Sequence, residues 1–309
     1  MTNLTAKRFT DEAAARKHLE SVRWPDGPIC PHCGVINNAH RIEGKSARPG
    51  LWFCADCRKQ FTVTVGTLFE DSKVPLNKWL LAVHFMSASK KGMSAHQLHR
   101  MLGVTYKTAW FMAHRIREAM RELHPEPLGG TGKTVEADET VIGGKERNKH
   151  KSKRNPKNIG AVGKEIAFSL VERGGKVRSH HVPNVTSKTL RPILVAQVDR
   201  KSVLMTDDAG QYRNVGLEFA GFHTVNHGIE EYVRGEAHTN TIEGYFSILK
   251  RGINGVYHHV SQQHLKRYLA EFDFRYNERI ALGVTDDERA EKALIGIGGK
   301  RLTYRRADA

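Results

Sequence analysis

Three acidic residues, each in a different kind of segment, have the side chains needed for metal-dependent phosphodiester chemistry. Asp138 lies in a β-prone run, Asp207 ends a second apolar run, and Glu243 opens a helical stretch. Carboxylates at the ends of two strands and on a later helix can converge on two divalent cations. Such ions activate a water or hydroxyl and stabilise the leaving oxygen of a phosphodiester. Oxygen ligands favour Mg²⁺ or Mn²⁺ over zinc.

Electrostatics supports the same interpretation. Two carboxylates ~4 Å apart repel by roughly 4 kcal/mol at an effective dielectric constant near 20. A cluster of three is therefore unfavourable unless positive charge fills it.

Other acids lie next to these candidates. Because side chains alternate along a strand, Glu139 should face away from Asp138, whereas Glu136 should share its face and stays an alternative ligand. Asp208 directly follows Asp207, which we prefer because it is the first acid after the apolar run.

The helical stretch around Glu243 places several polar residues along one line. Lys250 follows Glu243 by about two turns, so both should lie on one helix face, where Lys250 can touch DNA. Asn240 lies one turn before Glu243 and is an alternative third catalytic position.

The composition points to a polyanionic partner. The chain has 309 residues with 49 Lys and Arg against 33 Asp and Glu, a net charge of +16. Nucleic acid is the obvious phosphodiester for such a chain. No apolar run approaches a membrane span, and the N-terminus lacks the apolar core of a signal peptide. We therefore expect a cytoplasmic, nucleoid-associated protein without membrane contact.

All four cysteines occur as two CxxC pairs, Cys30–Cys33 and Cys54–Cys57, separated by the 20 residues numbered 34–53. This spacing is typical of a zinc ribbon, in which four thiolates complete a tetrahedral shell. In a reducing compartment cysteines stay unpaired, so we expect one structural Zn²⁺.

A helical segment follows. Helices are expected over residues 10–22 with Thr10 as the cap, 75–87, 95–102 after Ser94, and from Thr105 to about residue 123. A short helix, a glycine turn at Gly103 and a longer helix match a helix-turn-helix, whose second helix enters the major groove. The residues expected to face DNA are Tyr106, Lys107, Trp110, His114 and Arg117. A plain helical hairpin with Trp110 buried is the alternative.

A Pro- and Gly-rich linker, residues 124–133, precedes a segment with strand patterning. Strands are expected over residues 135–142, 166–171, 177–182 and 203–206, with a hairpin turn at Gly174 and Gly175 and a helix over residues 186–198. Three strands in a meander, then helix, strand and a long helix give an α/β order seen in RNase H-like folds.

A strongly basic loop separates the first two strands. Residues 145–164 contain eight Lys or Arg and one Glu, a net charge of +7. Such runs are usually solvated loops, but the position beside Asp138 favours phosphate contact. The loop residues expected to bind DNA are Lys149, Lys151, Lys153 and Arg154, joined by Lys250 and Arg251 from the later helix.

Several motifs together give the chain a specific resemblance. The motifs are CPHCG and CADC, Trp52-Phe53, VEADET at 135–140, TDD at 206–208 and HTNTIEGYFSILKRG at 238–252. With these, the chain resembles bacterial insertion-sequence transposases of the ISXO type, which join an N-terminal zinc ribbon to an RNase H-like DDE domain. The resemblance implies cleavage and transfer of DNA strands at the ends of a mobile element. It maps the metal-binding acids to Asp138, Asp207 and Glu243 and the basic catalytic residue to Lys250.

We therefore predict an α/β protein in five parts: N-terminal helix and zinc ribbon (1–70), helix-turn-helix-like segment (71–123), linker (124–133), RNase H-like DDE domain (134–285) and charged C-terminal tail (286–309). The expected cofactors are two Mg²⁺ or Mn²⁺ ions and one Zn²⁺. The expected partner is double-stranded DNA, bound by a homo-oligomer. The alternatives are a DNA-binding regulator with an inactive nuclease-like domain and a hydrolase of RNA hybrids.

Overall fold

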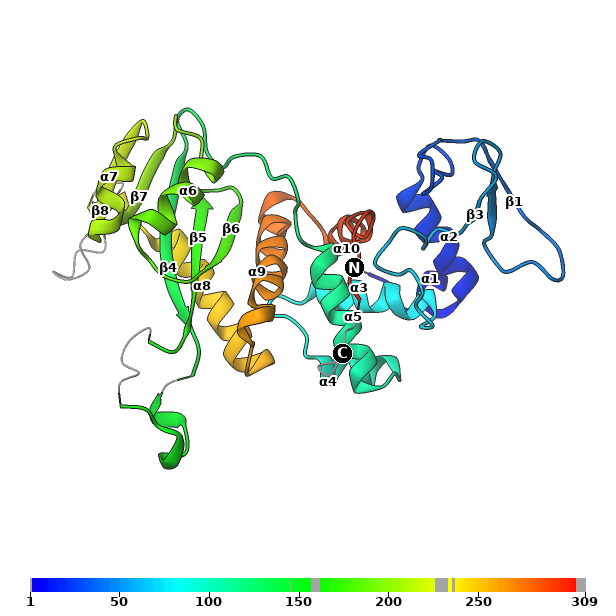
Figure 1. Ribbon diagram of the computed structural model, residues 1–309, viewed down its shortest axis with the longest axis horizontal. Coiled ribbons are helices and arrows are strands. Elements are labelled where there is room, and N and C mark those ends of the chain that lie inside the picture. The colour runs from blue at the N-terminus through cyan, green and yellow to red at the C-terminus, as the bar shows by residue number, and fades with distance from the viewer. Residues whose placement is uncertain (1, 145, 157–161, 226–232, 235–236, 304–309) are drawn as a thin grey trace. The chain divides into compact units, whose positions relative to one another are not determined.

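The computed structural model describes residues 2–144, 146–156, 162–225, 233–234 and 237–303 (Figure 1). The chain forms two compact units. The first comprises Met1–Arg121 together with Gly283–Ala309, and the second is Glu122–Leu282. The first unit is thus built from both ends of the chain, an arrangement that the sequence patterns did not predict.

The first unit begins with two helices, α1 (Lys7–Thr10) and α2 (Glu12–Arg23). The side chain of Asp11, not of Thr10 as predicted, caps α2 by accepting the N–H of Ala14 at 2.7 Å. A small antiparallel sheet follows, with the strands β1 (Ala39–Arg41), β2 (Trp52–Cys54) and β3 (Gln60–Phe61).

Three helices then follow: α3 (Leu76–Ala88), α4 (Ala95–Leu102) and α5 (Tyr106–Ala119). The predicted caps are confirmed, since the hydroxyls of Ser94 and Thr105 accept N–H groups of the first turns of α4 and α5. Gly103 ends α4 with φ 59°, a left-handed conformation that favours glycine.

The predicted C-terminal tail at 286–309 is wrong for its first part. Residues Asp286–Ile295 form the helix α10, which begins with a capping box between Thr285 and Glu288 and packs against α3. Leu294 is buried on this helix, and Arg289 donates to the carbonyl of Ser87 at 3.0 Å. Charged residues dominate the sequence of this segment, which is why a tail was predicted. Its apolar residues nevertheless lie along one side of the helix, and this side is buried. Residues 304–309 lie outside the described residues.

The second unit contains a five-stranded sheet in the order β6-β5-β4-β7-β8. The strands are β4 (Thr134–Ile142), β5 (Glu165–Glu172), β6 (Val177–Val182), β7 (Val203–Asp207) and β8 (Gly221–Val225). The meander β4-β5-β6 is antiparallel, as predicted, whereas β7 and β8 run parallel to β4. A short hairpin, β9 (Val233–Arg234) and β10 (Ala237–His238), precedes the next helix.

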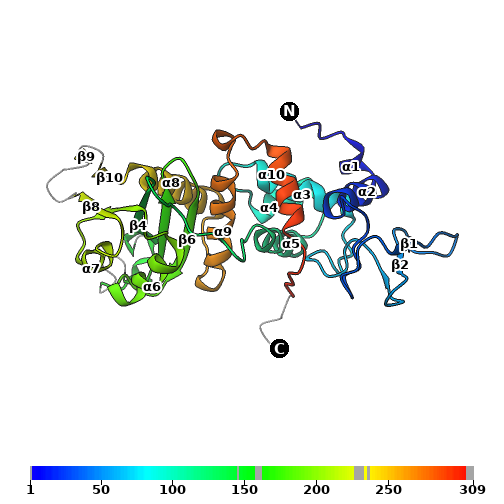
Figure 2. The ribbon, with the colours of Figure 1, turned by 90° about the horizontal axis from the view of Figure 1, so that it is seen from above.

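Helices cover both faces of this sheet (Figure 2). On one face lie α8 (Asn240–Gly252) and α9 (Gln262–Asn277), which share a core with Ala167 and Val171. On the other face lie α6 (Ser187–Gln197) and α7 (Arg213–Gly216), in a core with Phe168 and Leu170. Alternate residues of each strand therefore enter different cores.

The outer edge of β6 is covered by side chains of α9 rather than by another strand. Asn277 accepts the N–H of Val177 at 2.7 Å and donates to its carbonyl at 2.9 Å. Asp273 accepts both the N–H and the hydroxyl of Ser179 at 2.7 Å. These contacts satisfy backbone groups that a strand edge would otherwise expose.

Short helical turns complete the second unit. They are η1 (Glu146–Asn148), η2 (Lys151–Lys153), η3 (Gly210–Tyr212), a π-helical turn Ile253–Tyr257 after α8, and η6 (Ile280–Leu282). In the part of the chain that the structure describes, every helix is too short or too polar to cross a lipid bilayer.

Candidate metal centres and active site

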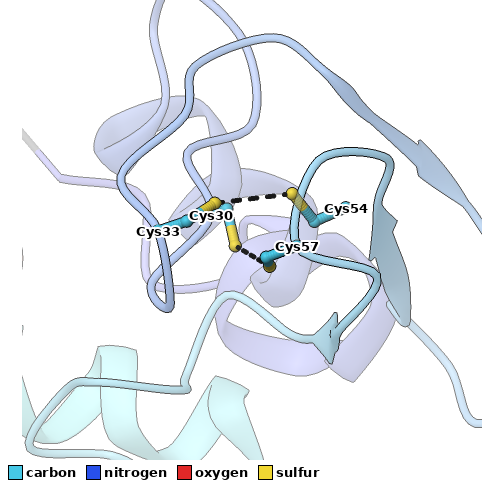
Figure 3. A group of neighbouring side chains, drawn as sticks. All are labelled: Cys30, Cys33, Cys54 and Cys57. Carbon is cyan, nitrogen blue, oxygen red and sulfur yellow. Dashed lines mark hydrogen bonds between the residues drawn. The ribbon is translucent and has the colours of Figure 1, made fainter.

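The four cysteines form a compact cluster in the first unit (Figure 3). Their sulfurs all lie within 4.8 Å of one another, with 3.6 Å between Cys30 and Cys57 and between Cys33 and Cys54. Thiolates around a tetrahedral zinc ion lie roughly 3.8 Å apart, given Zn–S bonds of about 2.3 Å. The cluster therefore fits the predicted structural Zn²⁺.

The environment of Cys30 favours the ligand form of its side chain. Burial by itself would raise the pKa of Cys30, but hydrogen bonds from the N–H groups of His32 and Cys33 and from neighbouring thiols lower it to about 7. A thiol that ionises near neutral pH is a ready metal ligand.

In the second unit, Asp138 lies on the central strand β4, opposite Ser169 of β5. It shares the face of β4 that carries Glu136 and Ile142, the face toward α8 and α9. Burial, together with the charges of Glu139, Asp207 and Glu243, raises the pKa of Asp138 to about 7, against the opposing effect of the hydrogen bond from the N–H of Glu139. The three predicted acids thus lie close enough to act on one another.

Asp207 is the last residue of β7, the parallel neighbour of β4. The pairing aligns Glu136 with Met205. Asp138 and Asp207 each lie two residues beyond this last aligned pair, so by alternation both face the same side of the sheet. The adjacent Asp208 has a different partner, Arg213, at 3.6 Å.

Glu243 lies in the first turn of α8, which packs against β4. Its side chain is exposed, and its Oε1 accepts the hydroxyl of Thr239 at 3.1 Å. Asn240, the alternative third position, is the first residue of α8 and is exposed as well. Lys250 and Arg251 are exposed in the last turn of the same helix.

The two other acids of the β4 motif have partners elsewhere. Glu136 is fully buried and forms an ion pair with Arg173 at 2.7 Å. Glu139 accepts hydrogen bonds from the hydroxyl of Tyr212 and from Gln211, the latter at 3.0 Å. Tyr212 belongs to the core on the α6 side of the sheet, so Glu139 and Asp138 face opposite ways, in line with the predicted alternation.

The acidic site is less tightly gathered than the thiol site. Among the described residues, the cysteines are the one group of three or more potential ligands gathered closely enough to hold an ion as they stand. The carboxylates nevertheless fit Mg²⁺ or Mn²⁺ by chemistry, because they supply oxygen ligands and because their negative charges add to burial in raising the pKa of Asp138. A cation would offset that repulsion.

The helix α5 does not present the predicted DNA-contact face in full. Tyr106 is 44% exposed and stacks on His96, and Lys107 is exposed beside it. His114 and Arg117, however, are 1% and 2% exposed, so the prediction that they face DNA is wrong. The C-terminal half of α5 is covered because α3 and α10 both pack against it.

Trp110 is half-buried on α5 and contacts the ring of His114 in a tilted arrangement, with ring centroids 4.1 Å apart. The end of α5 is held by Lys300, which donates to the carbonyls of Glu118 and Ala119 at 3.0 Å. A cation at a helix C-terminus is favourable. Lys300, however, lies far from α5 along the chain, so no local sequence pattern predicts this contact.

The basic loop between β4 and β5 is solvent-exposed where the structure describes it. Lys149, Lys151, Lys153 and Arg154 are all exposed. Lys149 pairs with Glu146 at 2.8 Å, and Arg154 donates to the carbonyl of Lys149 at 3.0 Å. The loop residues Lys145 and Lys157 lie outside the described residues.

The fold and site define a mixed α/β protein with a zinc-ribbon cysteine cluster and acids on two adjacent strands; Asp207 ends β7, whereas Asp138 lies in the middle of β4 rather than at the strand end expected from the sequence. Residues 10–60 match the transposase zinc-ribbon domain, and residues 127–277 match the ISXO2-like transposase domain. The chain is also 30% identical over 283 residues to an uncharacterized protein in transposable element ISH50 of Halobacterium salinarum, covering 87% of this chain and 92% of the relative. The chain therefore belongs to the ISXO2-like transposases.

Among solved structures, a chain of the simian T-cell lymphotropic virus intasome in complex with PP2A regulatory subunit B56 gamma matches at 14% identity and a TM-score of 0.27. The match covers 57% of this chain and 63% of the intasome chain.

Proposed function

We propose that this transposase cleaves DNA strands at the ends of an insertion sequence and joins the freed 3′-hydroxyl to target DNA. The observation that carries the proposal is that Asp138 of β4 is close enough to Asp207 of β7 and Glu243 of α8 for their charges to act on it; burial first, and these charges in addition, raise the pKa of Asp138 to about 7. A carboxylate cluster of this kind is costly in a fold and is typical of a functional site.

Asp138, Asp207 and Glu243 would hold the metal ions, two of Mg²⁺ or Mn²⁺. When bound, such ions supply an activated water or hydroxyl and offset the charge of the leaving oxygen. The protein's own contribution is to fix the carboxylates. The parallel pairing of β4 and β7 supports this role for the two aspartates, because it brings both to one face of the sheet, and the Thr239 hydroxyl would orient Glu243.

DNA binding belongs to the same proposal. The exposed cations of the β4–β5 loop follow directly from the strand that carries Asp138, and Lys250 lies about two turns after Glu243 on α8. Of the residues of the proposed helix-turn-helix, Tyr106 and Lys107 at the exposed start of α5 are the ones that we still propose to contact the DNA groove. Two DNA ends must be held together for strand transfer, so we propose that the chain acts as a homo-oligomer on double-stranded DNA.

The test is metal-dependent nicking of a labelled duplex that carries the terminal sequence of the element. With Mg²⁺ or Mn²⁺, the wild-type chain should nick the end, whereas Asp138→Asn, Asp207→Asn and Glu243→Gln should each lower the rate by at least about a hundredfold while binding the duplex normally. Asp208→Asn is the matched control, because Asp208 pairs with the exposed Arg213 and should nick at the normal rate.

The outcome also separates the alternatives. Equal nicking by the Asp138→Asn variant would remove the acid site, and duplex binding without nicking by the wild-type chain would favour a DNA-binding regulator. Comparing Asn240→Ala with Glu243→Gln decides which residue is the third catalytic position.

A further inference from the structure

The helix that carries Glu243 begins without a side-chain cap from its own segment. At the N-cap of α8, Thr239 makes no capping hydrogen bond, and its hydroxyl donates to Glu243 instead. The first N–H groups of a helix lack partners within the helix and need acceptors from outside it.

Glu136 of β4 supplies that acceptor from across the fold. Its Oε2 accepts the N–H of Ile242 at 2.9 Å, and its Oε1 accepts the hydroxyl of Thr241 at 2.8 Å. Both donors lie in the first turn of α8. A negative charge at a helix N-terminus is also favoured by the helix dipole.

The surroundings of Glu136 show that its charge is built into the core. The side chain is 0% exposed, and a buried charge is tolerated when it is paired and hydrogen-bonded. Arg173 provides the pair at 2.7 Å and also donates to the carbonyl of His238 at 2.8 Å, in the segment that enters α8. The N–H of Arg173 is bonded to Thr134 of β4, so this cation is anchored to the same strand.

We infer that Glu136 is a positioning residue that seats the start of α8 on β4 and thereby holds Glu243 beside Asp138. The inference rests on the proposed function, since it assumes that Glu243 and Asp138 share a metal site. Glu136 and Asp138 lie two residues apart on one strand face, so a single strand provides both a ligand and the seat of the helix that carries another ligand.

The experiment measures Mn²⁺ binding to the full-length, DNA-free protein by electron paramagnetic resonance, with hydrogen exchange of residues 239–249 as a second readout. The variants are Glu136→Gln and Thr241→Val, which alter the acceptor and one donor. Glu172→Gln is the matched control, because Glu172 also accepts a backbone N–H, that of Gly129 at 2.9 Å, and pairs with Lys133, yet both partners belong to the segment leading into β4 rather than to α8.

Glu136→Gln should weaken Mn²⁺ binding about tenfold, the scale found when a partner of a metal ligand is lost, and speed exchange at the start of α8. Thr241→Val should change both readouts in the same direction, and Glu172→Gln should change neither. Thr241→Val also keeps the test open if Glu136→Gln fails to fold.

Three results would overturn the inference. Loss of Mn²⁺ binding in Glu136→Gln with normal binding in Thr241→Val would make Glu136 a direct ligand. Normal binding in both, while Asp138→Asn binds weakly, would remove the positioning role and leave the proposed function standing. If Asp138→Asn itself bound Mn²⁺ like the wild-type chain, the proposed function would fail and the inference with it.

Discussion

At the scale of single residues, the three acids of β4 have different partners, although two of them, Glu136 and Asp138, share one face of the strand. Asp138 faces the site that it shares with Asp207 and Glu243, while Glu136 accepts hydrogen bonds from α8. Glu139, on the other face, is held by Tyr212 and Gln211 of the turn that follows β7. Of these three acids, Asp138 is a proposed metal ligand. Glu136 and Glu139 instead contact the segments that carry the other proposed ligands, Glu243 and Asp207.

The raised pKa of Asp138 makes a prediction about stability. Its pKa is about 7 in the folded chain and near 3.8 when unfolded, so between these values the folded state binds more protons. Stability from this group is therefore greatest at low pH and falls as pH rises toward 7. Without metal, Asp138→Asn should be more stable than the wild type at pH 8 but not at pH 4.

The measurement is thermal unfolding of the second unit's transition in a chelating buffer at both pH values. A gain of about 1 kcal/mol would raise the midpoint by roughly 2–4 °C at pH 8. An equal midpoint for both proteins at pH 8 would contradict the raised pKa of Asp138 in the folded chain.

At the scale of secondary-structure elements, α10 is the part most at odds with the sequence pattern. Leu294 is 3% exposed in the first unit and the next residue, Ile295, is 61% exposed. Leu294→Ala should destabilise the first unit by about 2–5 kcal/mol through lost burial and a cavity. Ile295→Ala, the matched control, should cost less than about 0.5 kcal/mol.

Chemical denaturation followed by tryptophan fluorescence can compare these two variants. Trp79 of α3 is buried in the first unit, where α10 packs against its helix. Equal stability of the two variants would show that α10 does not contribute to the first unit's core.

The β4–β5 loop makes a prediction about DNA binding. Replacing Lys149, Lys151, Lys153 and Arg154 by Ala removes four exposed cations. If each contacts a phosphate, the slope of log affinity against log salt concentration should become shallower by about 3–4. Replacing Lys188 and Lys201, exposed residues on and just after α6, should leave the slope nearly unchanged; an unaltered slope in the loop variant would exclude the loop from the DNA interface.

Helix caps and strands could be predicted from the sequence, because the residues that determine them are neighbours along the chain. Ser94 and Thr105 cap helices as predicted, and the three-strand meander forms where β-prone runs flank Gly174 and Gly175. Long-range packing was not predictable in this way. His114 and Arg117 occupy positions that a helical pattern assigns to solvent, and they are buried because α10 returns from the far end of the chain. The capping of α8 by Glu136 likewise joins residues about a hundred positions apart.

At the scale of the whole molecule, the chain consists of two units with separate sources of stability. The first unit contains the cysteine cluster, and the second contains the acid site and the large sheet. We therefore expect two unfolding transitions in full-length protein. Removing zinc with a chelator, or replacing Cys54 by Ser, should lower the first unit's transition and leave the second unchanged.

Differential scanning calorimetry can measure both transitions, and His32→Ala serves as a control beside the cluster because His32 contacts the carbonyl of Gln60 rather than a sulfur. A single transition that shifts as a whole on chelation would show that the units unfold together.

The side chains that α9 lays along β6 also limit how copies of this protein can associate. Asn277 occupies the N–H and carbonyl of Val177, and Asp273 occupies the N–H of Ser179, so this part of the rim offers an incoming strand backbone groups that are already bonded. Neighbouring subunits cannot extend the sheet there by β-augmentation, so joining at this rim would require contacts between side chains, which are easier to break and re-form than a continuous sheet.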